Sequence, residues 1–210
     1  MNLIEITCPR GAMSDNERAR MAASITSGTV GETDMAPEET MKRARRMTHI
    51  AFLELDGWTT GDGPVAPDAP PPFVVTVTVP EAWRSEVSRQ FTGVIRAAIR
   101  RYDAGRGYSR DGGDVWINTV GILDGSIGLN GTASTADDVL AYMTEEFRAK
   151  EPESVDVPGD VVIDPICGMH VRLVPKAITL DHDGQVIGFC SLGCRAAYAR
   201  QHGLEIPAAG

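Results

Sequence analysis

The first 131 residues repeat one pattern, and this duplication limits the folds that the chain can adopt. A β-prone run at residues 3–9 recurs at residues 73–80, an offset of 71 positions, and each run ends in proline. The tripeptide Leu-Asp-Gly at residues 55–57 recurs at residues 123–125, an offset of 68. Each half therefore reads strand, helix, strand and glycine-containing turn. Such internal similarity indicates a duplicated structural unit.

Each half has a predicted helix between its two strands. In the first half the helix begins after Ser14, where Glu17 completes a capping box. In the second half apolar residues recur at helical spacing and form one stripe: Val87, Phe91, Val94, Ile95, Ala98 and Ile99. The second strands are predicted at Thr48–Leu55 and residues 115–123. Because a helix crosses over between them, the two strands of each half should be parallel.

Proline and charge divide the chain into parts. A proline-rich stretch between the halves cannot continue a strand and acts as a stiff connector. Further along, acidic residues beside prolines are typical of a solvated linker. We expect a first domain at residues 1–148, an acidic linker at 149–160 and a second domain at 161–210. The first domain contains repeats at about 2–63 and 72–131, joined by the connector at 64–72. It ends in a helix at Ala136–Arg148 that Ser134 or Thr135 caps.

Charge and hydropathy exclude several classes of protein. The formal net charge of −9 argues against nucleic acid as a partner. The sequence has no 18-residue apolar run, so neither a membrane span nor a membrane partner is expected. Its first residues lack the charged and apolar segments of a signal peptide. We therefore expect a cytoplasmic protein.

Three cysteines near the C-terminus indicate a metal site. Cys167 lies in the run Asp-Pro-Ile-Cys-Gly-Met, and Cys190 and Cys194 lie in the run Phe-Cys-Ser-Leu-Gly-Cys. Three soft thiolates within about fifty residues can hold Zn(II) or Cu(I). Gly168 can supply the backbone angles of a turn after Cys167, and Ser191 can cap a following helix. The start of that helix would lower the pKa of Cys190 and Cys194.

This segment, at about residues 160–203, resembles the YHS domain, a treble-clef-like metal-binding module of the TRASH type. The resemblance rests on the Asp-Pro-x-Cys-Gly-Met opening, the aromatic residue before the second cysteine, and the Phe-Cys-Ser-x-x-Cys step into a helix. The spacing fixes no fourth ligand, and the nearby candidates are Asp164, Met169, His170, Asp181, His182, Asp183 and His202. A disulfide among the three cysteines is an alternative. Cys8, alone in an apolar run, is expected to be a buried core residue.

The duplicated unit resembles the tautomerase superfamily, in which two such units form a four-stranded sheet backed by two helices. The resemblance covers about residues 2–131 and rests on residues 3–6, residues 9–12, and Asp-Gly-Trp at 56–58 with its echo in the second half. It implies an α+β fold and a homotrimer. The family's general base is an N-terminal proline that becomes exposed when the initiator Met is removed. Here position 2 is Asn2, and Met1 is expected to stay attached, so ordinary tautomerase activity is not expected.

Two functions compete on these observations. In the first, the chain binds a soft metal ion on an oligomeric tautomerase-like scaffold, and senses, buffers or transfers it. In the second, the first domain is an enzyme of the superfamily with altered or lost isomerase chemistry, and the small domain is structural or regulatory. The resemblance makes Asn2, Arg10 and Trp58 candidates for the lining of a pocket, with Trp116 as a further one. Alternatively, Arg10 is a solvated loop charge, and the two tryptophans are core or trimer-contact residues. The intact cysteines and the missing proline favour the first function.

Overall fold

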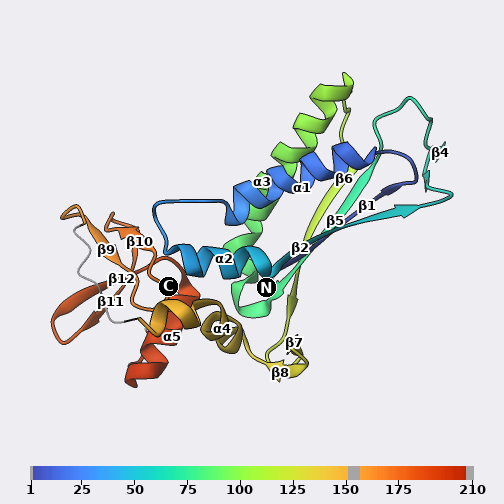
Figure 1. The fold of residues 1–210 in the computed structure, drawn as a ribbon. Coiled ribbons are helices and arrows are strands. Elements are labelled where there is room, and N and C mark those ends of the chain that lie inside the picture. Colours follow the sequence, from blue (N-terminus) through green and yellow to red (C-terminus); the bar gives the residue numbers. More distant parts are fainter. Residues whose placement is uncertain (1, 151–156, 207–210) are drawn as a thin grey trace.

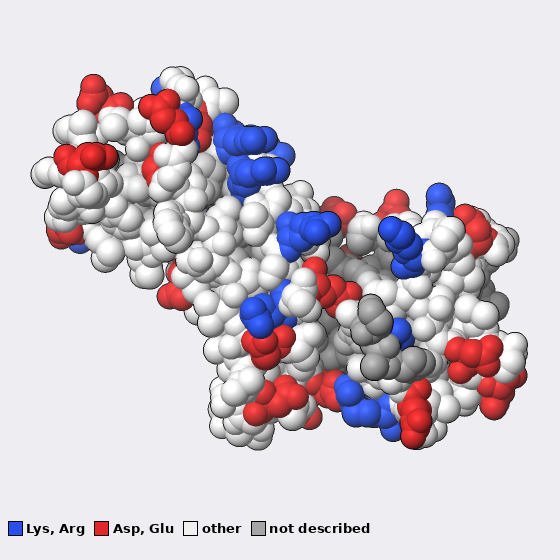
Figure 2. Space-filling model, turned by 180° about the vertical axis from the view of Figure 1, so that it is seen from behind, with Lys and Arg blue, Asp and Glu red and all other residues white. Residues whose placement is uncertain are grey.

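The computed structural model describes residues 2–150 and 157–206, which form two parts of an elongated molecule (Figure 1). The larger part is built on a four-stranded sheet, and the smaller part, residues 157–206, lies at one end of it. The acidic linker expected at 149–160 falls partly outside the described residues. Lys and Arg side chains form small groups interspersed with acidic ones on the face seen in Figure 2. Among the described residues, no helix is long and apolar enough to cross a membrane.

The sheet joins the two repeats edge to edge in the order β2-β1-β5-β6. β1 (Asn2–Pro9) is parallel to β2 (Thr48–Leu55), and β5 (Phe73–Pro80) is parallel to β6 (Val115–Ile122). β1 and β5 meet as an antiparallel pair at the centre. The parallel pairing predicted for each half is confirmed, and the α+β class with it.

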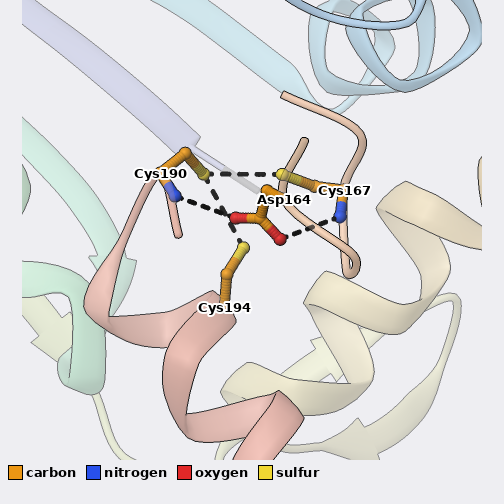
Figure 3. Close-up of side chains that lie close together, drawn as sticks. All are labelled: Asp164, Cys167, Cys190 and Cys194. Atoms are coloured by element: carbon orange, nitrogen blue, oxygen red, sulfur yellow. Dashed lines mark hydrogen bonds between the residues drawn. The ribbon is translucent and has the colours of Figure 1, made fainter. Parts of the chain in front are cut away.

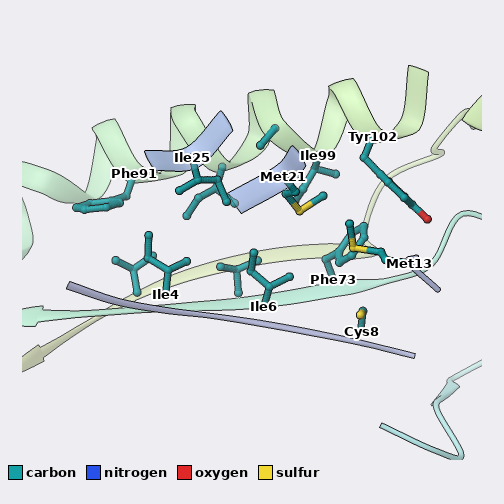
Figure 4. Close-up of a cluster of buried hydrophobic side chains, with 14 of the residues drawn as sticks. Ile4, Ile6, Cys8, Met13, Met21, Ile25, Phe73, Phe91, Ile99 and Tyr102 are labelled. Carbon is teal, nitrogen blue, oxygen red and sulfur yellow. The ribbon is translucent and has the colours of Figure 1, made fainter. Parts of the chain in front are cut away.

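Two long helices cover one face of this sheet. α1 (Asp15–Val30) begins with the predicted capping box of Ser14 and Glu17, and α3 (Glu81–Arg106) carries the predicted apolar stripe. Figure 4 shows side chains of β1 and β5 pointing toward these helices. The buried cluster between the layers includes Ile4, Ile6, Cys8, Phe73, Val75, Val77, Ile25, Phe91, Ile95 and Ile99. Cys8 is fully buried, as expected, and burial raises the pKa of its thiol to about 11.

The opposite face of the sheet carries no helix and exposes apolar side chains. Because side chains alternate along a strand, the residues between the buried ones point to this face. On the edge strands they include Leu53 and Leu55 of β2 and Trp116 and Val120 of β6, which are 43%, 50%, 63% and 44% exposed. We call these four residues the open sheet face.

A glycine-containing hairpin follows each half, as the repeat predicts. β3 (Thr59–Thr60) pairs with β4 (Gly63–Pro64), and β7 (Ile127–Leu129) pairs with β8 (Thr132–Ser134). The third predicted helix is α4 (Ala136–Arg148), which is capped by Thr135.

One helix lies outside the expected repeat pattern. α2 (Glu38–Arg46) stands between α1 and β2, where the pattern allows a single helix per half. Its Arg43 donates hydrogen bonds to the backbone carbonyl of Tyr142 and to the carboxylates of Glu145 and Glu146 on α4. α2 and α4 therefore form a platform beside the sheet, and the small part of the molecule packs against it.

The small part consists of two hairpin-like strand pairs and one helix, and we call it the cysteine module. Its helix begins after Ser191, whose hydroxyl accepts a hydrogen bond from the backbone N–H of Cys194, so the predicted cap is confirmed. The elements are β9 (Val161–Ile163) paired with β10 (His170–Arg172), β11 (Ile178–His182) paired with β12 (Gln185–Phe189), and α5 (Leu192–His202).

Candidate metal centre

The three predicted cysteines converge with one carboxylate. The Sγ atom of Cys190 lies 3.4 Å from that of Cys167 and 3.7 Å from that of Cys194. With a carboxylate oxygen of Asp164, the potential ligand atoms all lie within 4.8 Å of one another. Figure 3 shows the four side chains pointing toward a common centre from the turn after β9 and from the start of α5. From the sequence, Asp164 is one of seven candidates for the fourth ligand, and the fold places its carboxylate beside the three thiols.

Asp164 holds both cysteine segments in place. One carboxylate oxygen accepts hydrogen bonds from the backbone N–H groups of Ile166, at 2.8 Å, and Cys167, at 3.4 Å. The other oxygen accepts the N–H of Cys190 at 2.8 Å, so one side chain ties together segments 26 residues apart. Asp164 has no exposed surface. Burial, and then the charge of Cys190, raise the pKa of this carboxyl to about 6.

The thiols share their charge unequally. Hydrogen bonds from Cys167 and Cys194 lower the pKa of Cys190 to about 3, whereas the hydrogen bond to Cys190 raises the pKa of Cys167. For Cys194 the contact with Cys167 lowers the pKa, but the contact with Cys190 and burial raise it further, so the net shift is upward. The direction of the shift at Cys190 agrees with the lowered pKa expected at the start of α5, because two neighbouring thiols donate hydrogen bonds to its thiolate, whereas the net direction at Cys194 is upward.

The cluster has the spacing of a small metal shell. Two thiolates bound to Zn(II) at about 2.3 Å are about 3.8 Å apart in a tetrahedral site and about 4.0 Å apart in a trigonal one. The observed separations of 3.4 and 3.7 Å require the sulfurs to part by only a few tenths of an ångström. No pair is at bonding distance, and all four cysteines are free thiols. Three sulfurs with one carboxylate fit tetrahedral Zn(II), and the three sulfurs alone fit trigonal Cu(I).

The other candidate ligands lie elsewhere. The Nδ1 atom of His182 is 2.7 Å from the hydroxyl of Tyr198, and the ring centroids of His182 and His202 lie 4.9 Å apart in an edge-to-face arrangement, so these side chains form a separate aromatic group. The backbone N–H of His170 bonds to Met35. Met169 packs against the cysteines as part of their apolar surroundings. Among the six His and Asp candidates, only Asp164 belongs to the described cluster.

The turn that carries Cys167 depends on Gly168. Its φ of +78° lies in the left-handed region, where glycine is favoured. A Cβ atom there would lie 2.3 Å from Cγ of Pro37 at the start of α2 and 2.5 Å from Cε2 of Phe147 on α4. The turn therefore packs tightly against the platform formed by α2 and α4.

Replacing Gly168 with alanine is expected to destabilise the cysteine module. The left-handed backbone costs about 1–2 kcal/mol for a residue with Cβ, and the overlap with Pro37 and Phe147 adds about 1–3 kcal/mol. Gly184→Ala is the matched control, since its φ is +76° but no atom lies within 4 Å of the added Cβ. Thermal unfolding should show a distinctly larger loss for Gly168→Ala. Equal losses would contradict the packing at this turn.

Hydrogen bonds from the larger part fix the cysteine segments. The hydroxyl of Thr40 on α2 donates to the carbonyl of Cys167 at 3.3 Å. The carboxylate of Glu86 on α3 accepts the N–H of Leu192 at 3.1 and 3.2 Å, at the first residue of α5. Burial raises the pKa of Glu86. No sequence pattern indicates these contacts, because they join positions more than 100 residues apart.

Asn2 faces the cysteines across a cavity of about 340 Å³, which we call the seam cavity. Its walls come from both parts of the molecule: Asn2, Thr29, Val30, Thr40, Met41, Ala44, Trp83, Glu86, Val87, Gln90, Phe91, Leu140, Met143, Cys167, Met169, Cys190, Ser191, Gly193 and Cys194. The cysteine module therefore lies against the N-terminal end of β1.

The other pocket candidates lie at the far end of the same strand. Arg10 and Trp58 line a second cavity of about 440 Å³. The guanidinium of Arg10 donates to Asp56 at 2.6 Å, and both side chains are exposed. β1 has eight residues, so this cavity is about 25 Å from Asn2. One chain thus does not bring Asn2 together with Arg10 and Trp58, and Trp116 lies on the open sheet face.

Comparison with known proteins gives structural neighbours alone. No family model matches the chain, and no curated protein matches it. A fused 4-OT solved as an asymmetric trimer is 21% identical, with 65% of this chain and 98% of that chain covered and a TM-score of 0.40. Leishmania major MIF2 is 19% identical, with 63% and 96% covered and a TM-score of 0.40. A malonate semialdehyde decarboxylase inhibited by 3-bromopropiolate is 19% identical, with 74% and 99% covered and a TM-score of 0.38.

Proposed function

We propose that this protein binds one soft metal ion per chain, Zn(II) or Cu(I), through Cys167, Cys190 and Cys194, with Asp164 as the fourth donor. The observation that carries the proposal is the convergence of three thiols and one carboxylate within 4.8 Å. Asp164 is already oriented by three backbone N–H groups, and such outer contacts fix the direction of a metal ligand. The role is metal sensing, buffering or transfer.

The exposure of the cluster favours exchange of the ion over a purely structural site. Cys167 and Cys194 are buried, whereas Cys190 keeps an exposed side chain. All three line the seam cavity, so an ion can reach the sulfurs without unfolding of the module. A structural zinc site that staples a domain of about fifty residues is the simpler alternative.

Metal analysis tests the proposal directly. Protein purified without chelators and without a nickel column should contain about one equivalent of zinc or copper per chain. Removal of that metal should lower the melting temperature, and restoring it should reverse the change. Metal-free protein that neither takes up either ion nor changes in stability on its addition would contradict the proposal.

The scaffold is proposed to be a homotrimer in which the open sheet face is buried. Its exposed leucines, tryptophan and valine lie on the uncovered side of the sheet. Apolar surface of this kind marks interaction sites in soluble proteins. We also propose that residues 1–148 and 161–210 are separate domains joined by the acidic linker.

The alternative is an enzyme of the tautomerase superfamily with altered or lost chemistry. We expect the unmodified protein to show no appreciable enol–keto tautomerisation of 2-oxo acids. A positioned base contributes about 10²–10⁴-fold to such a reaction, and the amide of Asn2 is not basic. The described residues that line the seam cavity also include no Lys, Arg or His side chain to hold a substrate carboxylate. Steady-state assays on a simple 2-oxo acid measure the tautomerase activity. Robust turnover would favour the enzyme over the metal-binding protein.

The Asn2→Pro variant sharpens this comparison. It should permit removal of Met1 and place a secondary amine at the end of β1. If the Asn2→Pro variant is active and adding Arg10→Ala abolishes that activity, the arginine must come from another copy of the chain. Within one chain, Arg10 lies about 25 Å from position 2.

A further inference from the structure

Sulfur-containing residues are concentrated around the seam cavity. The chain has eight methionines and four cysteines, and six of these twelve line this one cavity. Nineteen of the 210 residues form its walls, so an even distribution would place about one such residue there. Met41 comes from α2, Met143 from α4, and Met169 follows the Cys167 turn. The three methionines therefore come from three segments and line the same cavity as the cysteines.

The charges around the cavity favour a cation. Among the described residues, its walls hold the carboxylate of Glu86 and three cysteine thiols, and no Lys, Arg or His. An anion placed here would meet negative charge without a counter-ion in a partly buried space. The cavity thus suits a small positive ion better than a carboxylate or phosphate substrate.

The cavity reaches the three cysteines but not Asp164. All three cysteines line the cavity, whereas Asp164 does not and has no exposed surface. An ion that enters through the cavity therefore meets the thioethers and thiols before it meets the carboxylate. This order separates the entry side of the site from its inner side.

We propose that the seam cavity is the entry chamber for Cu(I), and that Met41, Met143 and Met169 bind the ion through their thioether sulfurs before it passes to the three cysteines. This inference rests on the proposed metal-binding function and specifies the ion and its route. Thioethers are ligands for Cu(I), whereas Zn(II) takes thiolate, imidazole and carboxylate ligands. The transfer exchanges one sulfur ligand for another, each bound thiol releases its proton to water, and copper stays Cu(I) throughout.

Conservative substitution separates ligand chemistry from packing. Met→Leu keeps the apolar volume and usually costs little stability, but it removes the thioether. The full-length Met41→Leu/Met143→Leu/Met169→Leu variant is compared with Met13→Leu/Met21→Leu, whose two methionines are buried in the core between sheet and helices. Metal-free protein is mixed anaerobically with a coloured Cu(I) chelate, and loading is followed from loss of its colour. Zn(II) loading is measured in parallel with a zinc chelate.

The triple variant should load Cu(I) at least about tenfold more slowly than the control, with Zn(II) loading unchanged. Unchanged Cu(I) loading, or equal slowing for both ions, would make the methionines packing residues and overturn the inference. Should the triple variant fail to fold, the single variants Met143→Leu and Met169→Leu decide the matter, since both side chains are only half-buried. Wild-type protein that binds Zn(II) but not Cu(I) overturns this inference and leaves the proposed function standing. Binding of neither ion refutes the proposed function itself.

Discussion

A chain in which Cys167, Cys190 and Cys194 are all replaced by serine is expected to lose its bound metal completely. Serine hydroxyls are hard and neutral, and they do not replace thiolates for Zn(II) or Cu(I). A ligand present at 1,000 times its dissociation constant stabilises the folded state by about 4 kcal/mol. The variant should therefore lose about that much stability, concentrated in the cysteine module. Metal content by plasma mass spectrometry and thermal unfolding with and without added metal measure both effects.

The fourth cysteine provides the matched control. Cys8 is fully buried in the core of the sheet, in a separate cluster from the other three cysteines. Cys8→Ala should leave one equivalent of metal in place while lowering stability through the small loss of core packing. Cys190→Ser alone should weaken metal binding, because it removes the thiol that links the other two. A triple serine variant with wild-type metal content and melting would refute the site.

Placing a carboxylate on the open sheet face is expected to convert the proposed trimer into monomers. Trp116, at 63% exposure, is the most exposed of the four residues that define the face. Trp116→Glu removes apolar area and would bury an unpaired charge in the proposed interface, at a cost of several kcal/mol. A loss of about 4 kcal/mol corresponds to a thousandfold weaker association. Sedimentation velocity at micromolar concentration distinguishes the trimer from the monomer.

An equally exposed apolar residue elsewhere serves as control. Val186 of β12 is 57% exposed and lies in the cysteine module. Val186→Glu should leave the oligomeric state unchanged. If Trp116→Glu stays trimeric, or if the unmodified chain is a monomer, the open sheet face is not the interface.

Much of the fold follows from local sequence patterns. The capping box at Ser14 and the apolar stripe of α3 are set by residues three or four positions apart, so they can be read from a single helix. The parallel pairing within each half follows from the crossover helix between its strands. α2 lies outside the strand–helix–strand repeat, and its start at a proline N-cap without a side-chain hydrogen bond gives no capping signal in the sequence.

The sequence by itself identified the three thiols, the turn glycine and the Ser191 cap, because the Cys-Gly turn, the Cys-x3-Cys pair and the helix cap are each formed by residues at most four positions apart. Only the tertiary structure decided that Asp164 completes the cluster, since its selection among seven candidates depends on hydrogen bonds to Cys190, 26 residues away. The same holds for the seam cavity, where Asn2, Met41 and Met143 meet the cysteines across the joint between the two parts. Arg10 and Trp58 are predicted to share a pocket with Asn2, but the length of β1 separates them from it. Long-range packing brings distant residues together and holds neighbours along a strand apart, and no local pattern carries that information.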